Sequence, residues 1–246
     1  MSSSSTPTVM GASASKARRR FDGLGMADSS PFMRLFTLPG VFRPRSDSWM
    51  LARALEDEGL PPGARVLDVC TGSGVLAITA ARRGAHATAV DISRRAVLCA
   101  RLNARLNGVR VRAVRGDLLA AVGDEQFDAI VSNPPYLPGD PELPQSGAER
   151  AWEGGRDGRA LLDRLCEQAP SHLAPGGVLL VVHSSLCGTD STLDLLREQG
   201  LRADVAVRHH GSLGPLLRAR AAELESRDVL AAGQREEEVV VVRAAA

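Results

Sequence analysis

The sequence predicts an α/β fold, in which a mostly parallel seven-stranded sheet carries helices on both faces and ends in an antiparallel hairpin. Three observations support this prediction. Short apolar runs alternate with helical patterns from residue 65 onward, which is typical of parallel strands joined by crossover helices. A glycine-rich turn follows the first apolar run. The last two strand patterns have no clear crossover helix between them, which favours an antiparallel edge pair.

The expected strands and helices follow one another in a regular order. Each expected strand is a short apolar run, and glycine ends several of the expected helices. The strands are expected at residues 65–70, 87–90, 109–114, 127–132, 178–182, 203–208 and 238–243. The helices between them are expected at residues 75–83, 94–107, 161–172 and 193–199. Four consecutive valines in the last strand indicate burial on both faces.

Two further segments lie beside this alternating core. Before the first strand, Asp47 or Ser48 is expected to cap a helix that carries Trp49 on its apolar face. The Pro61–Gly63 turn ends that helix. Between the last two strands, residues 211–233 are interpreted as a loop or a partial helix.

The composition indicates one globular domain with an N-terminal tail. The chain has 246 residues, of which 44% are hydrophobic and 24% are charged. Its net charge of +1 gives no global basic field of the kind that nucleic-acid-binding proteins often carry. We expect residues 1–31, which are rich in serine, to be a disordered tail, and residues 32–246 to form a single domain.

Several other classes of protein are disfavoured. No apolar run approaches the ~18 residues that a membrane span needs, and the N-terminus lacks the apolar region of a secretory signal. The four cysteines are scattered and have no metal-ligand spacing, so they are expected to be reduced thiols: Cys70, Cys99, Cys166 and Cys187. We therefore expect a cytoplasmic protein with no metal site.

The first strand leads into a glycine-rich turn that suits a bound cofactor. Glycines in residues 67–74 let the backbone pass close under a ligand, and the following helix presents free N–H groups. Gly72, Gly74 and Ala77 also satisfy the dinucleotide-binding fingerprint, with Asp91 further along the chain. From this motif alone, a nicotinamide-dependent dehydrogenase remains an alternative.

Three aspartates at strand ends favour a nucleoside cofactor other than a nicotinamide dinucleotide. Asp91 ends the second strand, where its carboxylate can accept hydrogen bonds from both ribose hydroxyls. Asp117 follows the third strand and is placed to accept from an adenine amino group. Asp68 ends the first strand and can face an ammonium group, which S-adenosylmethionine has and NAD lacks. Together these aspartates predict S-adenosylmethionine as the cofactor.

The tetrapeptide Asn133-Pro134-Pro135-Tyr136 after the fourth strand is the most specific signal in the sequence. The two prolines stiffen the loop and lack N–H donors, so its carbonyl groups stay free. A carboxamide and a neighbouring carbonyl can then accept both N–H bonds of a planar –NH2 group and aim its nitrogen at a sulfonium methyl group. Tyr136, the only tyrosine, can pack against this flat group. The tetrapeptide therefore predicts an N-methyltransferase.

At these residues the chain resembles the HemK family of class I S-adenosylmethionine-dependent methyltransferases, which have a Rossmann-like fold and methylate the glutamine of a Gly-Gly-Gln motif in peptide-chain release factors. It looks closest to the short HemK2-type branch. The resemblance extends from about residue 41 to residue 243 and rests on three stretches: residues 43–51, 133–136 and 151–159.

The resemblance implies a role for each matching residue. The target amide would be bound by Asn133 and the Pro134 carbonyl, with Pro135 and Tyr136 completing the pocket. The implied cofactor-binding residues are Ser48, Asp68, Cys70, Thr71, Gly72, Gly74, Asp91, Ile92, Asp117, Leu118 and Asn133. The implied partners are a release factor as substrate and, as in short-branch relatives outside bacteria, a small activating subunit.

Two departures from the family pattern leave alternatives open. Cys70 stands where the family usually has glycine, and Arg45 and Ser46 replace acidic residues of the short branch. The same tetrapeptide also serves enzymes that methylate adenine in nucleic acids, although those usually add a recognition domain or a basic face. A small-molecule N-methyltransferase and an inactive cofactor-binding protein are the remaining alternatives.

Overall fold

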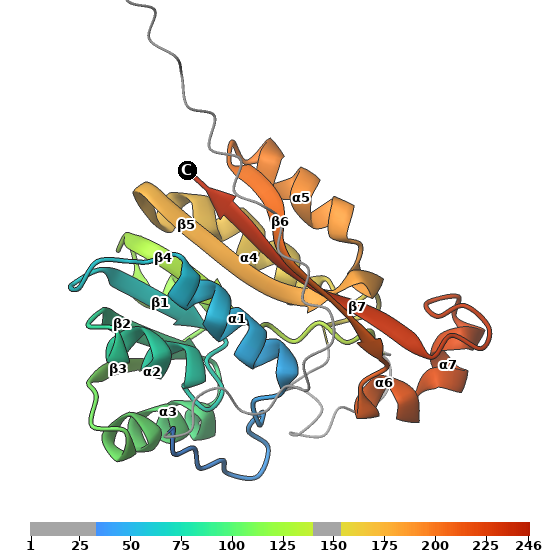
Figure 1. Cartoon of the computed structure of the whole chain (residues 1–246), viewed down its shortest axis with the longest axis horizontal. Coiled ribbons are helices and arrows are strands. Elements are labelled where there is room, and N and C mark those ends of the chain that lie inside the picture. The colour runs from blue at the N-terminus through green and yellow to red at the C-terminus, as the bar shows by residue number, and fades with distance from the viewer. Residues whose placement is uncertain (1–32, 140–153) are drawn as a thin grey trace, which may run out of the picture.

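The computed structural model describes residues 33–139 and 154–246 of the chain and arranges them around one seven-stranded sheet (Figure 1). The strand order is β3-β2-β1-β4-β5-β7-β6. Strands β1 to β5 pair in parallel, whereas β7 pairs antiparallel with both β5 and β6. The strands are β1 Arg65–Val69, β2 His86–Asp91, β3 Val111–Arg115, β4 Phe127–Ser132, β5 Leu173–Ser184, β6 Arg202–Ser212 and β7 Glu236–Ala245.

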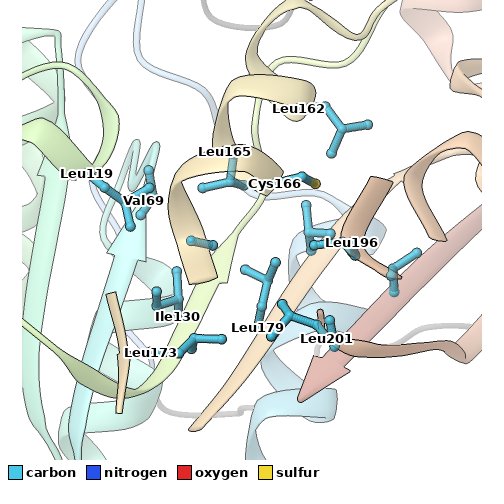
Figure 2. Close-up of a cluster of buried hydrophobic side chains, with 14 of the residues drawn as sticks. Val69, Leu119, Ile130, Leu162, Leu165, Cys166, Leu173, Leu179, Leu196 and Leu201 are labelled. Carbon is cyan, nitrogen blue, oxygen red and sulfur yellow. The ribbon is translucent and has the colours of Figure 1, made fainter. Parts of the chain in front are cut away.

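Helices cover both faces of the sheet, as the alternating pattern predicts. One face buries a layer of small and branched side chains against α1 (Ser46–Asp57), α2 (Val75–Arg82) and α3 (Arg94–Leu106). The other face packs against α4 (Ala160–His172), α5 (Thr189–Glu198) and the short 3-10 helix η1 (Leu118–Val122). Figure 2 shows this second layer, in which leucines of α4 and α5 meet Ile130 and Leu179 of the sheet. These two apolar layers hold the strand ends in fixed positions.

The structure confirms the α/β class and the C-terminal antiparallel strands, but it extends the last strands. The first four strands lie within two residues of the expected limits, whereas β5, β6 and β7 are longer than expected at both ends. Glu236–Glu238 and His209–Gly211 carry no apolar pattern, yet their backbones pair in register. Long antiparallel pairing therefore continues past the apolar run that marks it in the sequence.

The expected cap of the first helix is wrong. The helix begins at Ser46 with Arg45 at the N-cap, so Asp47 and Ser48 lie inside the first turn. Both side chains contact Asn133 in the loop after β4, and from the N3 position Ser48 Oγ also accepts the backbone N–H of Arg45 at 3.4 Å, as in one half of a capping box.

Residues 213–235 form an insertion in the β6–β7 hairpin. It contains two short helices, α6 (Pro215–Ala219) and α7 (Ala221–Ser226), so the expectation of a loop or partial helix is confirmed. Another 3-10 helix, η3 (Ser185–Cys187), follows β5. The insertion has its own small apolar cluster, formed by Leu213, Leu217, Leu224 and Leu230, and Leu137 packs against that cluster.

The sheet has a topological switch point, at which strand order reverses, between β1 and β4. Ligands of open α/β sheets bind at the carboxyl ends of the strands at such a point. The glycine-rich turn follows β1 and the tetrapeptide follows β4, so both motifs lie at this edge. Across residues 33–139 and 154–246, no helix is long and apolar enough to cross a membrane.

Candidate active site

A cavity of about 980 Å³ opens at the carboxyl ends of the parallel strands. Its walls come from the segment before α1, from the loops after β1, β2, β3 and β4, and from α6 of the hairpin insertion. The lining residues are 40–42, 44–48, 70–73, 75–76, 90–96, 115–118, 133–137, 161, 164, 214–217, 237 and 239. The cavity thus brings the glycine-rich turn and the tetrapeptide together.

The turn after β1 has three residues in the left-handed backbone region. Cys70 has φ 59°, Gly72 has φ 53° and Gly74 has φ 87°. A Cβ on Gly74 would lie 2.9 Å from the Cα of Ala100 in α3, so glycine is required there for the close approach of α3 as well as for the backbone angle. Cys70 is exceptional, because a non-glycine residue in this region is strained.

Asp91 lies on the wall of the cavity and ties two loops together. One carboxylate oxygen accepts the backbone N–H of Gly72 at 3.0 Å, and the other accepts that of Ser93 at 2.9 Å. Burial raises the pKa of this carboxyl, although both hydrogen bonds lower it. The position at the end of β2 matches the expectation from the sequence, and each oxygen keeps a lone pair for a further donor.

Asp68 lies beneath the turn and is not part of the cavity wall. Its Oδ2 atom accepts the Thr71 hydroxyl at 2.5 Å and the backbone N–H of Ala77 at 3.0 Å. Its Oδ1 atom is buried and has no hydrogen-bond partner among the described residues. Burial raises the pKa of Asp68 to about 7, with the Asp91 charge adding a smaller contribution.

Asp117, Leu118 and Ile92 line the other end of the cavity. Asp117 accepts a hydrogen bond from the Arg164 guanidinium of α4 at 2.7 Å, in an ion pair whose side chains are about half exposed. Leu118 is buried and has φ 45°, another left-handed non-glycine residue. Ile92 is 67% exposed, which leaves an apolar side chain available to a flat ligand.

The carboxamide of Asn133 is held from one side. Its Nδ2 atom donates to Asp47 Oδ2 at 3.1 Å and to Ser48 Oγ at 3.0 Å. Tyr136 donates its hydroxyl to the same Asp47 oxygen at 2.8 Å. Within the described part of the chain, neither Asn133 Oδ1 nor the Pro134 carbonyl accepts a hydrogen bond. With respect to residues 33–139 and 154–246, the loop therefore keeps two acceptors without a partner at the cavity.

The segment after the undescribed residues 140–153 packs against the backbone of the tetrapeptide. Gly154 donates to the Leu137 carbonyl at 2.9 Å, and a Cβ on Gly154 would lie 2.6 Å from the Pro135 carbonyl oxygen. A Cβ on Gly158 would collide with the Tyr136 carbonyl oxygen. The glycines of the third family-like stretch thus allow close contact with the tetrapeptide, whereas residues 151–153 of that stretch lie outside the described residues.

Comparison with known proteins identifies the family. The family model described as "Methyltransferase small domain" matches residues 33–149. A predicted protein N5-glutamine methyltransferase of Methanocaldococcus jannaschii is 37% identical over 172 residues, which are 69% of this chain and 85% of that protein. The chain belongs to the HemK family of S-adenosylmethionine-dependent methyltransferases.

Other relatives of this methyltransferase are longer than the matched region. The release factor glutamine methyltransferase of Geobacter sulfurreducens is 36% identical over 58% of this chain and 53% of its own length. The one from Deinococcus radiodurans is 42% identical over 57% of this chain and 52% of its own length. The methyltransferase therefore spans about half the length of these relatives.

Solved structures confirm the fold of a class I methyltransferase. The E. cuniculi Mtq2–Trm112 complex, described as responsible for methylation of the eRF1 translation termination factor, superposes with a TM-score of 0.59 at 24% identity. The match covers 84% of this chain and 98% of that one. A T. thermophilus 16S rRNA methyltransferase, solved with AdoMet and guanosine, gives a TM-score of 0.55 at 22% identity over 85% of this chain and 46% of that one.

The residues of the methyltransferase fit its cofactor. The left-handed turn of residues 70–74 lets the backbone line the cavity closely, and Asp91 presents a half-buried carboxylate there. Carboxylates at this position suit ribose hydroxyls, which are neutral donors. The unpartnered Asp68 oxygen adds a buried acceptor behind the same turn.

Sequence reasoning missed two acidic residues at this site. Asp47 was expected only as a helix cap, yet it contacts Asn133 and Tyr136. Glu237 of β7 lines the cavity and accepts from Ser184 and from the backbone N–H of Gly214. Burial raises the pKa of Glu237. No local pattern marks either residue, because their partners lie far away in the chain.

Proposed function

We propose that this methyltransferase transfers the methyl group of S-adenosylmethionine to the side-chain amide nitrogen (N5) of a glutamine, in the Gly-Gly-Gln motif of a peptide-chain release factor. The observation that carries this proposal is the pair of acceptors at the cavity, Asn133 Oδ1 and the Pro134 carbonyl, while the Asn133 nitrogen is engaged on its other side. A primary amide has two N–H bonds and therefore matches two acceptors.

Orientation supplies most of the catalysis in this proposal. Pro134 and Pro135 fix the backbone, so the two acceptors lose little freedom when the target amide binds. Holding a nucleophile in line with its reaction partner is worth as much as ~7–11 kcal/mol in favourable cases. Because a neutral amide nitrogen is a weak nucleophile, accepting its N–H bonds also raises the electron density on the nitrogen.

Tyr136 forms a wall beside the proposed amide site. Its hydroxyl is bonded to Asp47, and burial together with the Asp47 charge keeps the pKa of the phenol well above its usual value. The ring therefore stays neutral and fixed. A neutral aromatic face suits the flat amide of a glutamine side chain.

The cofactor-binding residues are assigned from their places around the cavity. When bound, S-adenosylmethionine supplies a methyl group activated by a positively charged sulfur. We assign Asp91 to the ribose hydroxyls and the turn of residues 70–74 to the methionine part, with Asp68 behind it. Asp117, Leu118 and Ile92 are assigned to the adenine end. Ser48 is assigned to Asn133 instead, because its hydroxyl oxygen accepts from that amide.

A methyl-transfer assay tests the proposal. The purified protein is incubated with methyl-labelled S-adenosylmethionine and either a release factor or duplex DNA, with Asn133→Ala as the control variant. We expect label on the release factor only, and its loss in Asn133→Ala. Labelling of DNA, or labelling of the release factor by Asn133→Ala at the wild-type rate, would reject the proposal.

The same assay examines whether a partner subunit is needed. The E. cuniculi neighbour was solved as a complex with Trm112, and full activity of this chain alone would exclude a need for such a subunit. Release factors act in translation, so we propose that this enzyme acts in the cytoplasm.

A further inference from the structure

We propose that Asp47 is a positioning residue, which determines that the oxygen of the Asn133 carboxamide, and not its nitrogen, faces the substrate. This inference rests on the proposed function, since it takes that oxygen as an acceptor for the target amide. Asp47 touches neither substrate nor cofactor in this account and acts through Asn133.

Asp47 is a buried carboxylate on which four donors converge. It is 8% exposed and lies in the first turn of α1. Its Oδ1 atom accepts the Ser48 backbone N–H at 2.7 Å and the Ser48 hydroxyl at 3.3 Å. Its Oδ2 atom accepts Asn133 Nδ2 at 3.1 Å and the Tyr136 hydroxyl at 2.8 Å. The positive end of the α1 dipole also favours a carboxylate at this place.

The chemistry of Asp47 decides the orientation of Asn133. An ionised carboxylate has no hydrogen to donate, so whichever end of the Asn133 amide faces it must be the –NH2 end. A rotation of the amide by 180° would place Asn133 Oδ1 about 3 Å from a carboxylate oxygen, where two acceptors repel each other and a buried group loses its partner. The Oδ1 atom of Asn133 therefore faces the substrate.

Ser48 reinforces the same choice. Its hydroxyl hydrogen is directed to Asp47 Oδ1, so its oxygen is left to accept from Asn133 Nδ2 at 3.0 Å. Ser48 is 2% exposed, which keeps this hydroxyl from being redirected to water. Both hydrogens of the Asn133 –NH2 group are therefore used on the side away from the substrate.

Asp47→Asn is the first test, because it removes the charge and keeps the shape. The Ser48 backbone N–H cannot turn away, so it selects the oxygen of the new amide and leaves the –NH2 end facing Asn133. Asn133 must then rotate and present its own –NH2 to the substrate. We expect kcat to fall about a hundredfold, as for loss of one positioned group at a reacting centre, while the Kd for S-adenosylmethionine stays within about twofold. Asp57→Asn, in the exposed last turn of the same helix, should change neither.

A charge swap separates orientation from a merely structural role. In Asp47→Asn combined with Asn133→Asp, the amide at position 47 donates to one oxygen of the carboxylate at position 133. The other oxygen of that carboxylate again accepts from the target amide. We expect the double variant to recover at least tenfold in kcat over Asp47→Asn. Asn133→Asp alone places two carboxylates against each other and should be the poorest of the three.

Two kinetic results would overturn the inference. One is a kcat for Asp47→Asn within twofold of wild type. The other is a double variant whose loss in kcat equals the product of the two single losses. Thermal unfolding of the four proteins needs no substrate, and the swap should lower Tm less than the sum of the single effects. An additive Tm would reject the Asp47–Asn133 pairing itself, whereas failure of wild type to methylate a release factor would reject only the proposed substrate.

Discussion

Gly158→Ala is expected to disturb the active site, because the added methyl group would push against the backbone of the tetrapeptide. Gly158 has φ 79°, and a Cβ there would collide with the Tyr136 carbonyl oxygen and lie 2.8 Å from Cys187 Sγ. That sulfur also donates to the Tyr136 carbonyl at 3.0 Å. An added methyl group must therefore displace either the backbone of Tyr136 or η3, which follows β5.

The expected loss of stability in Gly158→Ala has two contributions, which a matched control variant can separate. An alanine in the left-handed region costs roughly 1–2 kcal/mol, and forcing a methyl group into a packed site costs typically ~1–3 kcal/mol. Gly158→Ala should therefore lower the free energy of unfolding by about 2–5 kcal/mol. Gly176 has φ 75° and nothing within 4 Å of its Cβ position, so Gly176→Ala should show only the first part.

Urea unfolding and initial rates of methyl transfer provide the measurements. We expect kcat to fall about a hundredfold in Gly158→Ala, because a shift of about 1 Å in a positioning loop has this effect, and to stay unchanged in Gly176→Ala. Equal losses of stability in the two variants, with kcat unchanged in both, would refute the view that residues 154–158 position the tetrapeptide.

Three further outcomes follow from the cofactor end of the site. Asp91→Ala should raise the Kd for S-adenosylmethionine at least tenfold by calorimetry, and an unchanged Kd would remove Asp91 from the ribose site. Cys70→Gly should change the free energy of unfolding by less than about 1 kcal/mol, since relief of the left-handed strain offsets the entropy cost of glycine and the lost packing of the Cys70 side chain against the core; a loss of more than about 2 kcal/mol would contradict this. The folded-state pKa of Asp68 is raised to about 7 from 3.8, so the folded state binds its proton more tightly and stability falls as pH rises from about 4 to 7. Asp68→Asn should not show this decline, and the same dependence of unfolding free energy on pH in wild type and variant would refute the raised pKa of Asp68.

The sequence was sufficient for the parts of the fold that local patterns encode. Strands β1 to β4 were predicted because each is an apolar run with glycine or proline close to at least one of its ends. The position of Asp91 and of the tetrapeptide at one edge followed from parallel pairing alone. Such features depend on neighbours within a few residues, or on the rule that ligands bind at carboxyl ends of strands.

Contacts between distant parts of the chain could not be predicted in this way. The Asp47–Asn133 bond joins residues 86 positions apart, and in the sequence an aspartate beside a helix start indicates a cap. The Asp117–Arg164 ion pair joins the loop after β3 to a face of α4 that the helical pattern marks only as polar. The ends of β6 and β7 pair through backbone groups, which no side-chain pattern reports.

The most direct measurement is the mass of a release factor after incubation with this enzyme and S-adenosylmethionine, followed by mapping of the modified residue. One substrate has the native Gly-Gly-Gln motif, and in the other alanine replaces its glutamine. The account predicts one added methyl group, on that glutamine, in the native substrate and none in the altered one. Methylation of both substrates at another residue, or of neither while the enzyme binds S-adenosylmethionine, would contradict it.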